Sequence, residues 1–430
     1  MGLSASLFYD PADSEKQTLH RRIIPSEEQF EDQRDRWNAL ADYLVAELGK
    51  RSGYPINTWL QGSYKFGTQV RGAHKGEEFD IDLGVYYRWS GNPNEGDYEP
   101  GVLKSMVQGA LRSYDADGVL ETVTPPKDRC CRIRFAGDFH IDVPAYHLDP
   151  DRDERQLATA TNRWEDSDPK ALYLWFRDRV DETTRTKVRR KVRYLKIWVN
   201  LKFPEGPGRP TSTLLTVLAA EASDDIDNQL PDDEALAALL KIIVDRLEKS
   251  RIVPNPVDAT EDLAQKFSAG DFAAFLSALK EFRSVADEAN SAPDEISAAD
   301  KWSVPFEHFF PLPEIDAELA KGTSVPMRRS IPEIAVEAIS QNNPTKRWYG
   351  TNQVGPIPKG CAILFKITNP EVLPAGASIH WMVRNEGEEA EGVNDLGHIA
   401  GTGFNAKETS AYKGTQYMDC IVRRECPDRC

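Results

Sequence analysis

Acidic residues alternate with apolar residues in two short runs of this 430-residue chain. In Phe79 to Leu83, strand periodicity places Asp80 and Asp82 on one face and the apolar residues on the other. In a second run, Phe139 to Pro144, Asp142 stands between apolar neighbours. Three carboxylates from neighbouring strands can hold two divalent ions about 4 Å apart, and hard oxygen ligands favour Mg²⁺ or Mn²⁺. The pattern predicts a two-metal site for phosphoryl transfer, with Asp142 on the ion nearer the attacking hydroxyl.

An isolated pair of aspartates two residues apart is more often a solvated strand face, so the preceding residues decide between the two interpretations. Gln61 to Thr68 reads Gln-Gly-Ser-Tyr-Lys-Phe-Gly-Thr and lies one short predicted helix upstream of Asp80. Gly62 would let the backbone approach a phosphate closely, and Ser63 can donate hydroxyl and amide hydrogens. A Gly-Ser turn at this spacing before the aspartates predicts a binding site for a triphosphate.

This combination resembles the polymerase-β-like nucleotidyltransferases, and within them the bacterial CD-NTases, relatives of cyclic GMP-AMP synthase and oligoadenylate synthase. The resemblance covers roughly residues 20 to 220. It implies an α+β fold with a polymerase-β-like palm, two Mg²⁺ or Mn²⁺ ions as cofactors, and ATP and other nucleoside triphosphates as substrates. It also implies release of pyrophosphate and formation of a cyclic di- or trinucleotide second messenger. In the family such messengers serve CBASS-type antiphage defence by activating an effector encoded nearby.

A strongly basic segment, Arg185 to Lys196, carries apolar residues at helical spacing. Its simplest interpretation is a solvated helix with a run of charge. However, Arg193 to Trp198 resembles the helix with which the family clamps nucleotide phosphates, which makes Arg193 and Lys196 nucleotide-binding candidates. Arg189 to Lys191 are then expected to be solvated, or to form a regulatory basic surface for a protein partner.

A serine further along the chain is the remaining nucleotide-binding candidate. Pro210 to Thr216 resembles the family's Pro-Ser stretch, which implies that Ser212 contacts the triphosphate. Capping the N-terminus of a helix is the alternative role for Ser212. Thr213 stands where some relatives have an aromatic residue for stacking on the base, so base recognition stays open.

Sequence periodicity predicts the elements that position these residues. Helices are expected over residues 26–48, 169–180, 184–203, 213–222, 232–249 and 271–289, and strands over 79–87, 118–123, 131–135, 139–143, 362–367, 379–383 and 418–422. A loop rich in proline and charge is expected over 305–332. The chain is thereby divided into a catalytic lobe (1–165), a helical lobe that closes the nucleotide cleft (166–332) and a small C-terminal β domain (340–430).

The C-terminal part carries a pattern of its own, Trp-x-Val-x-Asn-x-Gly, over Trp381 to Gly387. Together with the glycines and Tyr412 that follow, it resembles the AGS-C domain, which occurs fused to such nucleotidyltransferases and is proposed to sense nucleotides. A small β-sandwich without any binding role is the alternative.

Composition narrows the remaining classes of function. The formal net charge of -16 disfavours a protein that coats long nucleic acid. No apolar run is long enough to span a membrane, and six scattered cysteines suit a reducing compartment, so a cytoplasmic enzyme is expected. The alternatives to a cyclic nucleotide synthase are a nucleotidyltransferase acting on RNA or protein, and a non-catalytic nucleotide sensor.

Overall fold

The computed structural model describes residues 2–11, 18–116, 119–121, 125–136, 139–313 and 332–424. The chain divides into two compact units, residues 23–284 and residues 2–22 with 285 onward, and each is described by itself. Parts of the expected strand at 118–123 and of the expected loop at 305–332 lie outside the described residues, as do Cys426 and Cys430. The expected division into three domains stays a prediction.

The first unit contains an eight-stranded sheet in the order β3-β4-β5-β2-β6-β7-β8, with β1 paired to β2. Its strands are β1 (Ile56–Gln61), β2 (Phe79–Arg88), β3 (Val119–Glu121), β4 (Cys131–Phe135), β5 (Phe139–Val143), β6 (Ala145–Asp149), β7 (Glu154–Ala158) and β8 (Trp164–Asp166). β2 lies at the centre, parallel to β5 and β6 and antiparallel to β1. The strands predicted at 79–87, 131–135 and 139–143 are confirmed, whereas β1, β6, β7 and β8 were not predicted.

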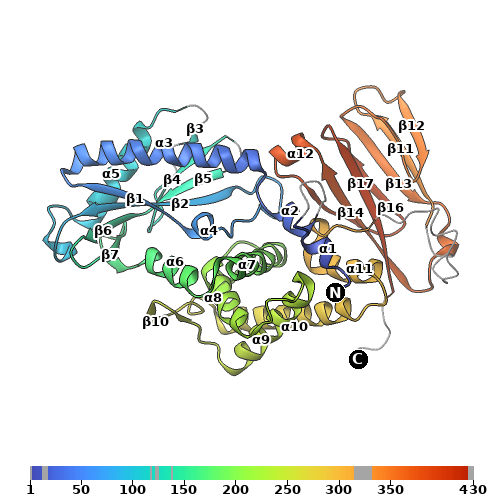
Figure 1. Ribbon diagram of the computed structural model, residues 1–430. Helices are drawn as coiled ribbons and strands as arrows, with labels where there is room; N and C mark the ends of the chain where they lie inside the picture. Colours follow the sequence, from blue (N-terminus) through green and yellow to red (C-terminus); the bar gives the residue numbers. More distant parts are fainter. Residues whose placement is uncertain are drawn as a thin grey trace. The chain divides into compact units, whose positions relative to one another are not determined.

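Two helices, α3 (Glu27–Ser52) and α5 (Pro100–Ser113), pack on one face of this sheet (Figure 1). α3 begins with a capping box between Ser26 and Gln29 and ends at Gly53, whose φ of 77° suits glycine. The apolar faces of both helices meet the buried strand residues in one core, with members such as Leu44, Leu48, Val107, Ile81, Leu83 and Ile141. The opposite face of β2 therefore remains available for Asp80 and Asp82.

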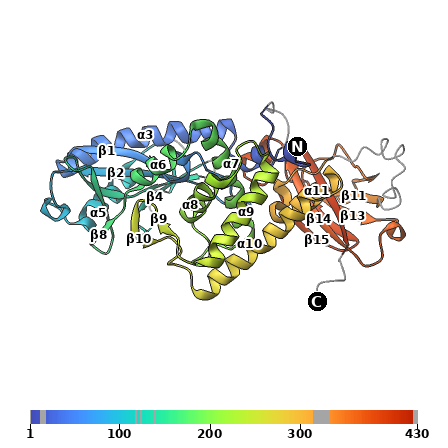
Figure 2. The same cartoon turned by 60° about the horizontal axis from the view of Figure 1, so that its bottom comes forward.

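The other helices of the first unit are α4 (Gly62–Phe66), α6 (Pro169–Asp178), α7 (Glu182–Lys202), α8 (Ser212–Ala222), α9 (Asp232–Lys249) and the greater part of α10 (Ala269–Asn290), whose last residues belong to the second unit. A hairpin is formed by β9 (Pro254–Asn255) and β10 (Asp258–Asp262). Figure 1 shows α7 and α8 on the side of the sheet opposite α3, and Figure 2 shows α8, α9 and α10 grouped together. The helices predicted after residue 166 are confirmed. Trp198 of α7 stacks on Phe282 of α10 with ring centroids 4.9 Å apart, which joins the two helices.

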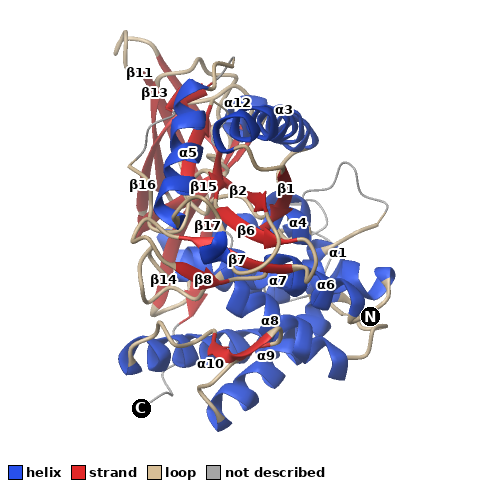
Figure 3. Cartoon of the chain, turned by 90° about the vertical axis from the view of Figure 1, so that its left-hand side faces the viewer, coloured by secondary structure: helices blue, strands red, loops and turns tan. Residues whose placement is uncertain are grey.

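The second unit consists mainly of two antiparallel sheets, drawn as red arrows in Figure 3. One has the order β12-β11-β13-β16 and the other β15-β14-β17. The strands are β11 (Ile334–Ser340), β12 (Arg347–Thr351), β13 (Cys361–Ile367), β14 (Ala377–Glu386), β15 (Gly397–Thr402), β16 (Asn405–Thr409) and β17 (Thr415–Arg424). The short helices α1 (Ala5–Phe8), α2 (Leu19–Ile23) and α12 (Glu388–Gly392) accompany the longer α11 (Glu295–Phe306).

Apolar residues from both sheets share one core, which includes Ile367, Ile379 and the fully buried Trp381. The Trp381 indole donates a hydrogen bond to the carbonyl of Gly403 at 2.7 Å. The expected loop at 305–332 is wrong at its start, because α11 and a 3-10 turn (Glu307–Phe309) continue through residue 309. Among the described residues, every helix of the chain is too short or too polar to span a bilayer.

Candidate active site

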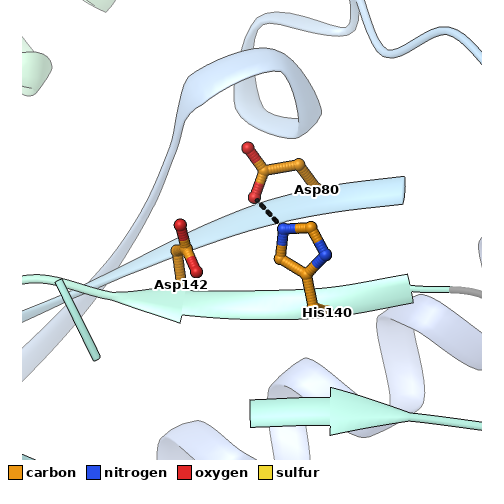
Figure 4. A group of neighbouring side chains, drawn as sticks. All are labelled: Asp80, His140 and Asp142. Carbon is orange, nitrogen blue, oxygen red and sulfur yellow. Dashed lines mark ion pairs between the residues drawn. The ribbon is translucent and has the colours of Figure 1, made fainter. Parts of the chain in front are cut away.

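The parallel register of β2 and β5 places four polar residues in a square on the free face of the sheet. Asp80 lies beside His140, and Asp82 lies beside Asp142. Figure 4 shows Asp80, His140 and Asp142 converging from the two strands. Ligand atoms of these three side chains lie within 4.8 Å of one another. The sequence predicted the three aspartates, and the register adds a histidine that the sequence analysis missed.

The antiparallel strand β4 adds a row of cations beside this square. Arg132 pairs with Asp142 across the register, and its Nη2 donates to Asp142 Oδ2 at 2.8 Å. Lys127 lies 3.3 Å from the same carboxylate. Although burial raises the pKa of Asp142, the hydrogen bonds and charge of Arg132 bring that pKa below its usual range. Asp142 is therefore held in its ionised form.

Asp82 has the opposite electrostatic environment. Burial, followed by the charges of Asp80 and Asp142, raises the pKa of Asp82 well above its usual range, and Lys196 and Arg132 counteract this only in part. Crowding of carboxylates in this way is unfavourable unless a cation neutralises them. Gly62 lies directly against Asp82, because a Cβ at Gly62 would be 1.8 Å from Asp82 Oδ2.

These residues fit the divalent ions that the sequence predicts. Asp80, Asp82 and Asp142 offer hard oxygen donors on one sheet face, and such donors suit Mg²⁺ and Mn²⁺. Burial is the largest cause of the raised pKa of Asp82 and the charges of Asp80 and Asp142 add to it, so a nearby cation would favour the ionised form. The two-ion assignment itself stays a prediction.

A cavity of about 840 Å³ opens beside the aspartates. Four residues predicted for the site line it, namely Ser63, Asp80, Lys196 and Ser212, together with Arg71, Glu78, Arg132, Arg134, His140, Asn200 and Arg209, which were not predicted. Gly62, Asp82, Asp142 and Arg193 are not among its lining residues. The cavity thus brings residues from the catalytic sheet, α4, α7 and α8 into one space.

Lys196 reaches the cavity from α7 and donates a hydrogen bond from Nζ to the carbonyl of Thr68 at 2.9 Å. Burial lowers the pKa of Lys196 to about 8, while the charge of Asp80 acts to raise it. Arg193 lies one turn earlier on the helix, and burial lowers its pKa to about 10. Lys196 is therefore better placed than Arg193 to meet a ligand in this cavity.

Ser212 is the first residue of α8, and its side chain is exposed. Thr211, and not Ser212, caps this helix, because the Thr211 side chain accepts a hydrogen bond from the Leu214 amide at 3.2 Å. The capping alternative for Ser212 is therefore wrong. Its hydroxyl lines the cavity at the positive end of an eleven-residue helix, a place that favours anions.

The expectation that Arg189 to Lys191 are solvated is also wrong. Arg190 is buried and forms a two-bond ion pair with Asp232, with Nε 2.6 Å from Oδ2. Lys191 is buried too, and Arg189 donates from Nε to the carbonyl of Phe66 at 2.8 Å. Arg190 and Arg189 thus join α7 to α9 and α4, and the buried Arg190 and Lys191 do not contribute to a basic surface for a partner.

Comparisons with known proteins agree with this geometry. Residues 56–146 match the family model of the cyclic GMP-AMP synthase DncV-like nucleotidyltransferase domain, and residues 316–426 match that of the adenylyl/guanylyl and SMODS C-terminal sensor domain. A cyclic GMP-AMP synthase of Escherichia albertii is 29% identical over 423 residues, which cover 97% of this chain and 92% of the relative. A c-di-GMP synthase of Roseivirga ehrenbergii is 26% identical over 254 residues, which cover 53% of this chain and 65% of the relative.

Among solved structures, the Vibrio cholerae DncV cyclic AMP-GMP synthase superimposes with a TM-score of 0.60 at 19% identity. The match covers 72% of this chain and 98% of that one. Together these comparisons show a DncV-like nucleotidyltransferase domain over residues 56–146, the polymerase-β-like fold, and an AGS-C sensor domain over residues 316–426.

Proposed function

We propose that the chain joins nucleoside triphosphates, with release of pyrophosphate, into a cyclic di- or trinucleotide. The observation that carries this proposal is the set of three aspartates on one sheet face beside a cavity of about 840 Å³. That volume lies in the upper part of the range for small-molecule sites, roughly 300–1,000 Å³, and suits a ligand larger than one small metabolite. The synthase names of two relatives support the same class of product.

Asp80, Asp82 and Asp142 would hold the two Mg²⁺ or Mn²⁺ ions. When bound, such ions lower the pKa of an attacking ribose hydroxyl and neutralise charge on the triphosphate and on pyrophosphate. Arg132 keeps Asp142 ionised and oriented, because its guanidinium contacts both carboxylate oxygens. Gly62 gives Asp82 the space to lie against the backbone.

The triphosphate would lie between the turn that carries Ser63 and the start of α8. Ser63 and Ser212 both line the cavity, and each offers a hydroxyl. Lys196 also lines the cavity, where it supplies a positive charge and is already held by its hydrogen bond to the carbonyl of Thr68. These donors would bind phosphate oxygens, and Asn200 and Arg209, which also line the cavity, would be left for the rest of the nucleotide.

The test is a labelling reaction. The full chain is incubated with labelled ATP, GTP, CTP and UTP and with Mg²⁺ or Mn²⁺, and the products are treated with phosphatase. We expect a small labelled product that resists phosphatase and that is absent for the variant Asp80→Ala with Asp82→Ala. Label found on RNA or on protein, with no small product, would instead support transfer to a macromolecule.

We further propose that the product is a messenger in CBASS-type antiphage defence and activates an effector encoded nearby. This step rests on the family resemblance. Cells that carry the gene with its neighbours should resist phage, and the Asp80→Ala variant should be as sensitive as cells without the gene. Equal protection by both would contradict the role.

The AGS-C domain has a cavity that could serve nucleotide sensing. Its volume is about 720 Å³, and strands of both sheets line it, including residues of β11, β13, β14 and β17. Tyr417 and Phe365 offer aromatic surface, and Gln416 and Asn385 offer amides. We propose that a nucleotide binds here, and saturable ATP or GTP binding that Tyr417→Ala weakens while Asp80→Ala does not would support this site.

A further inference from the structure

His140 is held from one side by a carboxylate that is not one of the predicted metal ligands. Its Nδ1 lies 2.8 Å from Glu78 Oε2. Glu78 in turn accepts a hydrogen bond from Arg134 Nε at 2.7 Å. A carboxylate that already accepts from an arginine is an acceptor for its other neighbours too, so the Nδ1 proton of His140 points toward Glu78.

The other ring nitrogen faces the aspartates. Nε2 lies 3.1 Å from Asp80 Oδ1, as the dashed line in Figure 4 marks. His140 is only 7% exposed, and Nε2 is a buried atom without a hydrogen-bond partner among the described residues. In a neutral ring with its proton on Nδ1, Nε2 is an acceptor, and so is the Asp80 carboxylate. Nε2 is buried and the Asp80 side chain is half exposed, and a cation between these two facing acceptors would satisfy both.

Asp142 completes the set on the second strand. One carboxylate oxygen of Asp142 lies within 4.8 Å of a possible ligand atom of His140 and of one of Asp80. Metal bonds of about 2.1 Å allow ligand atoms to lie about 4.2 Å apart across one ion, so small side-chain rotations would bring all three onto it. A carboxylate has about four lone-pair sites, so Asp142 can keep Arg132 and still bind an ion.

From this geometry we propose that His140 Nε2, with Asp80 and Asp142, is a protein ligand of one of the two ions, and that Glu78 positions the ring. This inference rests on the proposed two-metal function and names a ligand for it. An imidazole nitrogen suits first-row transition metals, whereas Mg²⁺ prefers oxygen ligands. An ion site made of His140, Asp80 and Asp142 should therefore prefer Mn²⁺ to Mg²⁺ more strongly than a site made of three aspartates would. Orientation by a second carboxylate is typical of metal-binding histidines.

The direct test is pulsed electron paramagnetic resonance of Mn²⁺ bound to the full chain with α,β-methylene-ATP. We expect an electron spin echo modulation from a directly bound ¹⁴N, which changes to a ¹⁵N coupling when the protein carries ¹⁵N-histidine. This arm uses the native sequence, so it does not depend on whether a variant folds. Retention of the ¹⁴N signal in the labelled protein, or no nitrogen coupling at all, would overturn the proposal.

Variants give a second readout through Mn²⁺ affinity. His140→Gln should weaken Mn²⁺ binding about 10- to 100-fold and Mg²⁺ binding much less, and Glu78→Gln should have a smaller effect in the same direction. The matched control is His74→Gln, since His74 is exposed and does not line the cavity. Mn²⁺ that binds through Asp80 and Asp82 without a histidine signal would refute this ligand and leave the proposed function standing. If the native chain neither bound Mn²⁺ nor made a nucleotide product, the proposed function itself would be refuted.

Discussion

The backbone of Gly62 lies against the carboxylate of Asp82 so closely that a side chain at Gly62 would place its Cβ 1.8 Å from Asp82 Oδ2. Gly62 also has a φ of 56°, in the left-handed region. Two independent requirements for glycine therefore meet at the start of α4. Gly62, in the turn predicted to bind the triphosphate, therefore also sets the position of Asp82, a predicted metal ligand.

Gly62→Ala should reduce nucleotide-joining activity by at least about 100-fold, because the added methyl group displaces Asp82 by more than the roughly 1 Å that costs this much in active sites. Gly53→Ala is the matched control, since Gly53 has a φ of 77° but no atom within 4 Å of its Cβ position. Both variants should lose about 1 kcal/mol of stability, and Gly53→Ala should keep its activity. Equal activity of the two variants would contradict the role of this contact.

Asp82→Asn should abolish activity and yet stabilise the metal-free chain. The pKa of Asp82 is raised in the folded chain, so the folded state binds its proton more tightly than the unfolded state does, and stability falls as pH rises through the raised pKa. At pH 7 the neutral amide removes this cost, and the melting temperature should rise by a few degrees. The check is thermal unfolding with EDTA, and a lower melting temperature for Asp82→Asn would contradict the account.

Arg132→Ala should lower activity about 10- to 100-fold, because Asp142 then loses its two-bond partner. Lys127→Ala should have little effect, since Lys127 is half exposed and lies 3.3 Å from the same carboxylate. Activities of the two variants measured at saturating metal give the comparison. If Lys127→Ala were the more damaging change, Asp142 would not depend on Arg132.

Ser212 and Thr211 should separate binding from stability. Ser212→Ala should raise the KM for nucleoside triphosphates about 10-fold, the equivalent of one hydrogen bond to a charged group, with little change in melting temperature. Thr211→Ala should cost about 1 kcal/mol of stability, because it removes the cap of α8. If Ser212→Ala lowered the stability and left the KM unchanged, the triphosphate would not bind at Ser212.

Lys196 should make nucleotide binding depend on pH. Its pKa is lowered to about 8, so it is charged below that pH and loses its charge as pH rises through 8. ATP affinity in the native chain should therefore fall above pH 8, and the fall should be smaller in Lys196→Arg, because the guanidinium stays charged. Titration calorimetry from pH 6.5 to 9.5 measures both, and parallel pH profiles would exclude Lys196 as the phosphate contact.

The sequence could predict those parts of the site that depend on local spacing. Strand alternation places Asp80 and Asp82 on one face, and the helical spacing of apolar residues over 26–48 predicts α3. His140 could not be recognised, because alternation says nothing about the register between β2 and β5 that brings it beside Asp80. The functions of Thr211 and Ser212 could not be separated either, because both types of residue cap helices well.

The basic helix shows a different limit. A run of cations in a sequence predicts a solvated face only when no acidic partner is near in the fold. Asp232, which starts α9, lies 42 residues from Arg190 and neutralises it inside the unit. Long-range pairing of this kind is invisible to local periodicity. Helix α7 was therefore predicted correctly as a helix, while the environment of its charges was not.

The mass and stoichiometry of the reaction product decide whether this chain makes a cyclic nucleotide. We expect a small product without a 5′-triphosphate or a free end, formed with one pyrophosphate released for each nucleotide that it contains. Liquid chromatography with mass spectrometry, together with a pyrophosphate assay, gives both values from one reaction. A linear product that keeps its triphosphate, or nucleotides found only on RNA or protein, would contradict the claim that this chain makes a cyclic nucleotide.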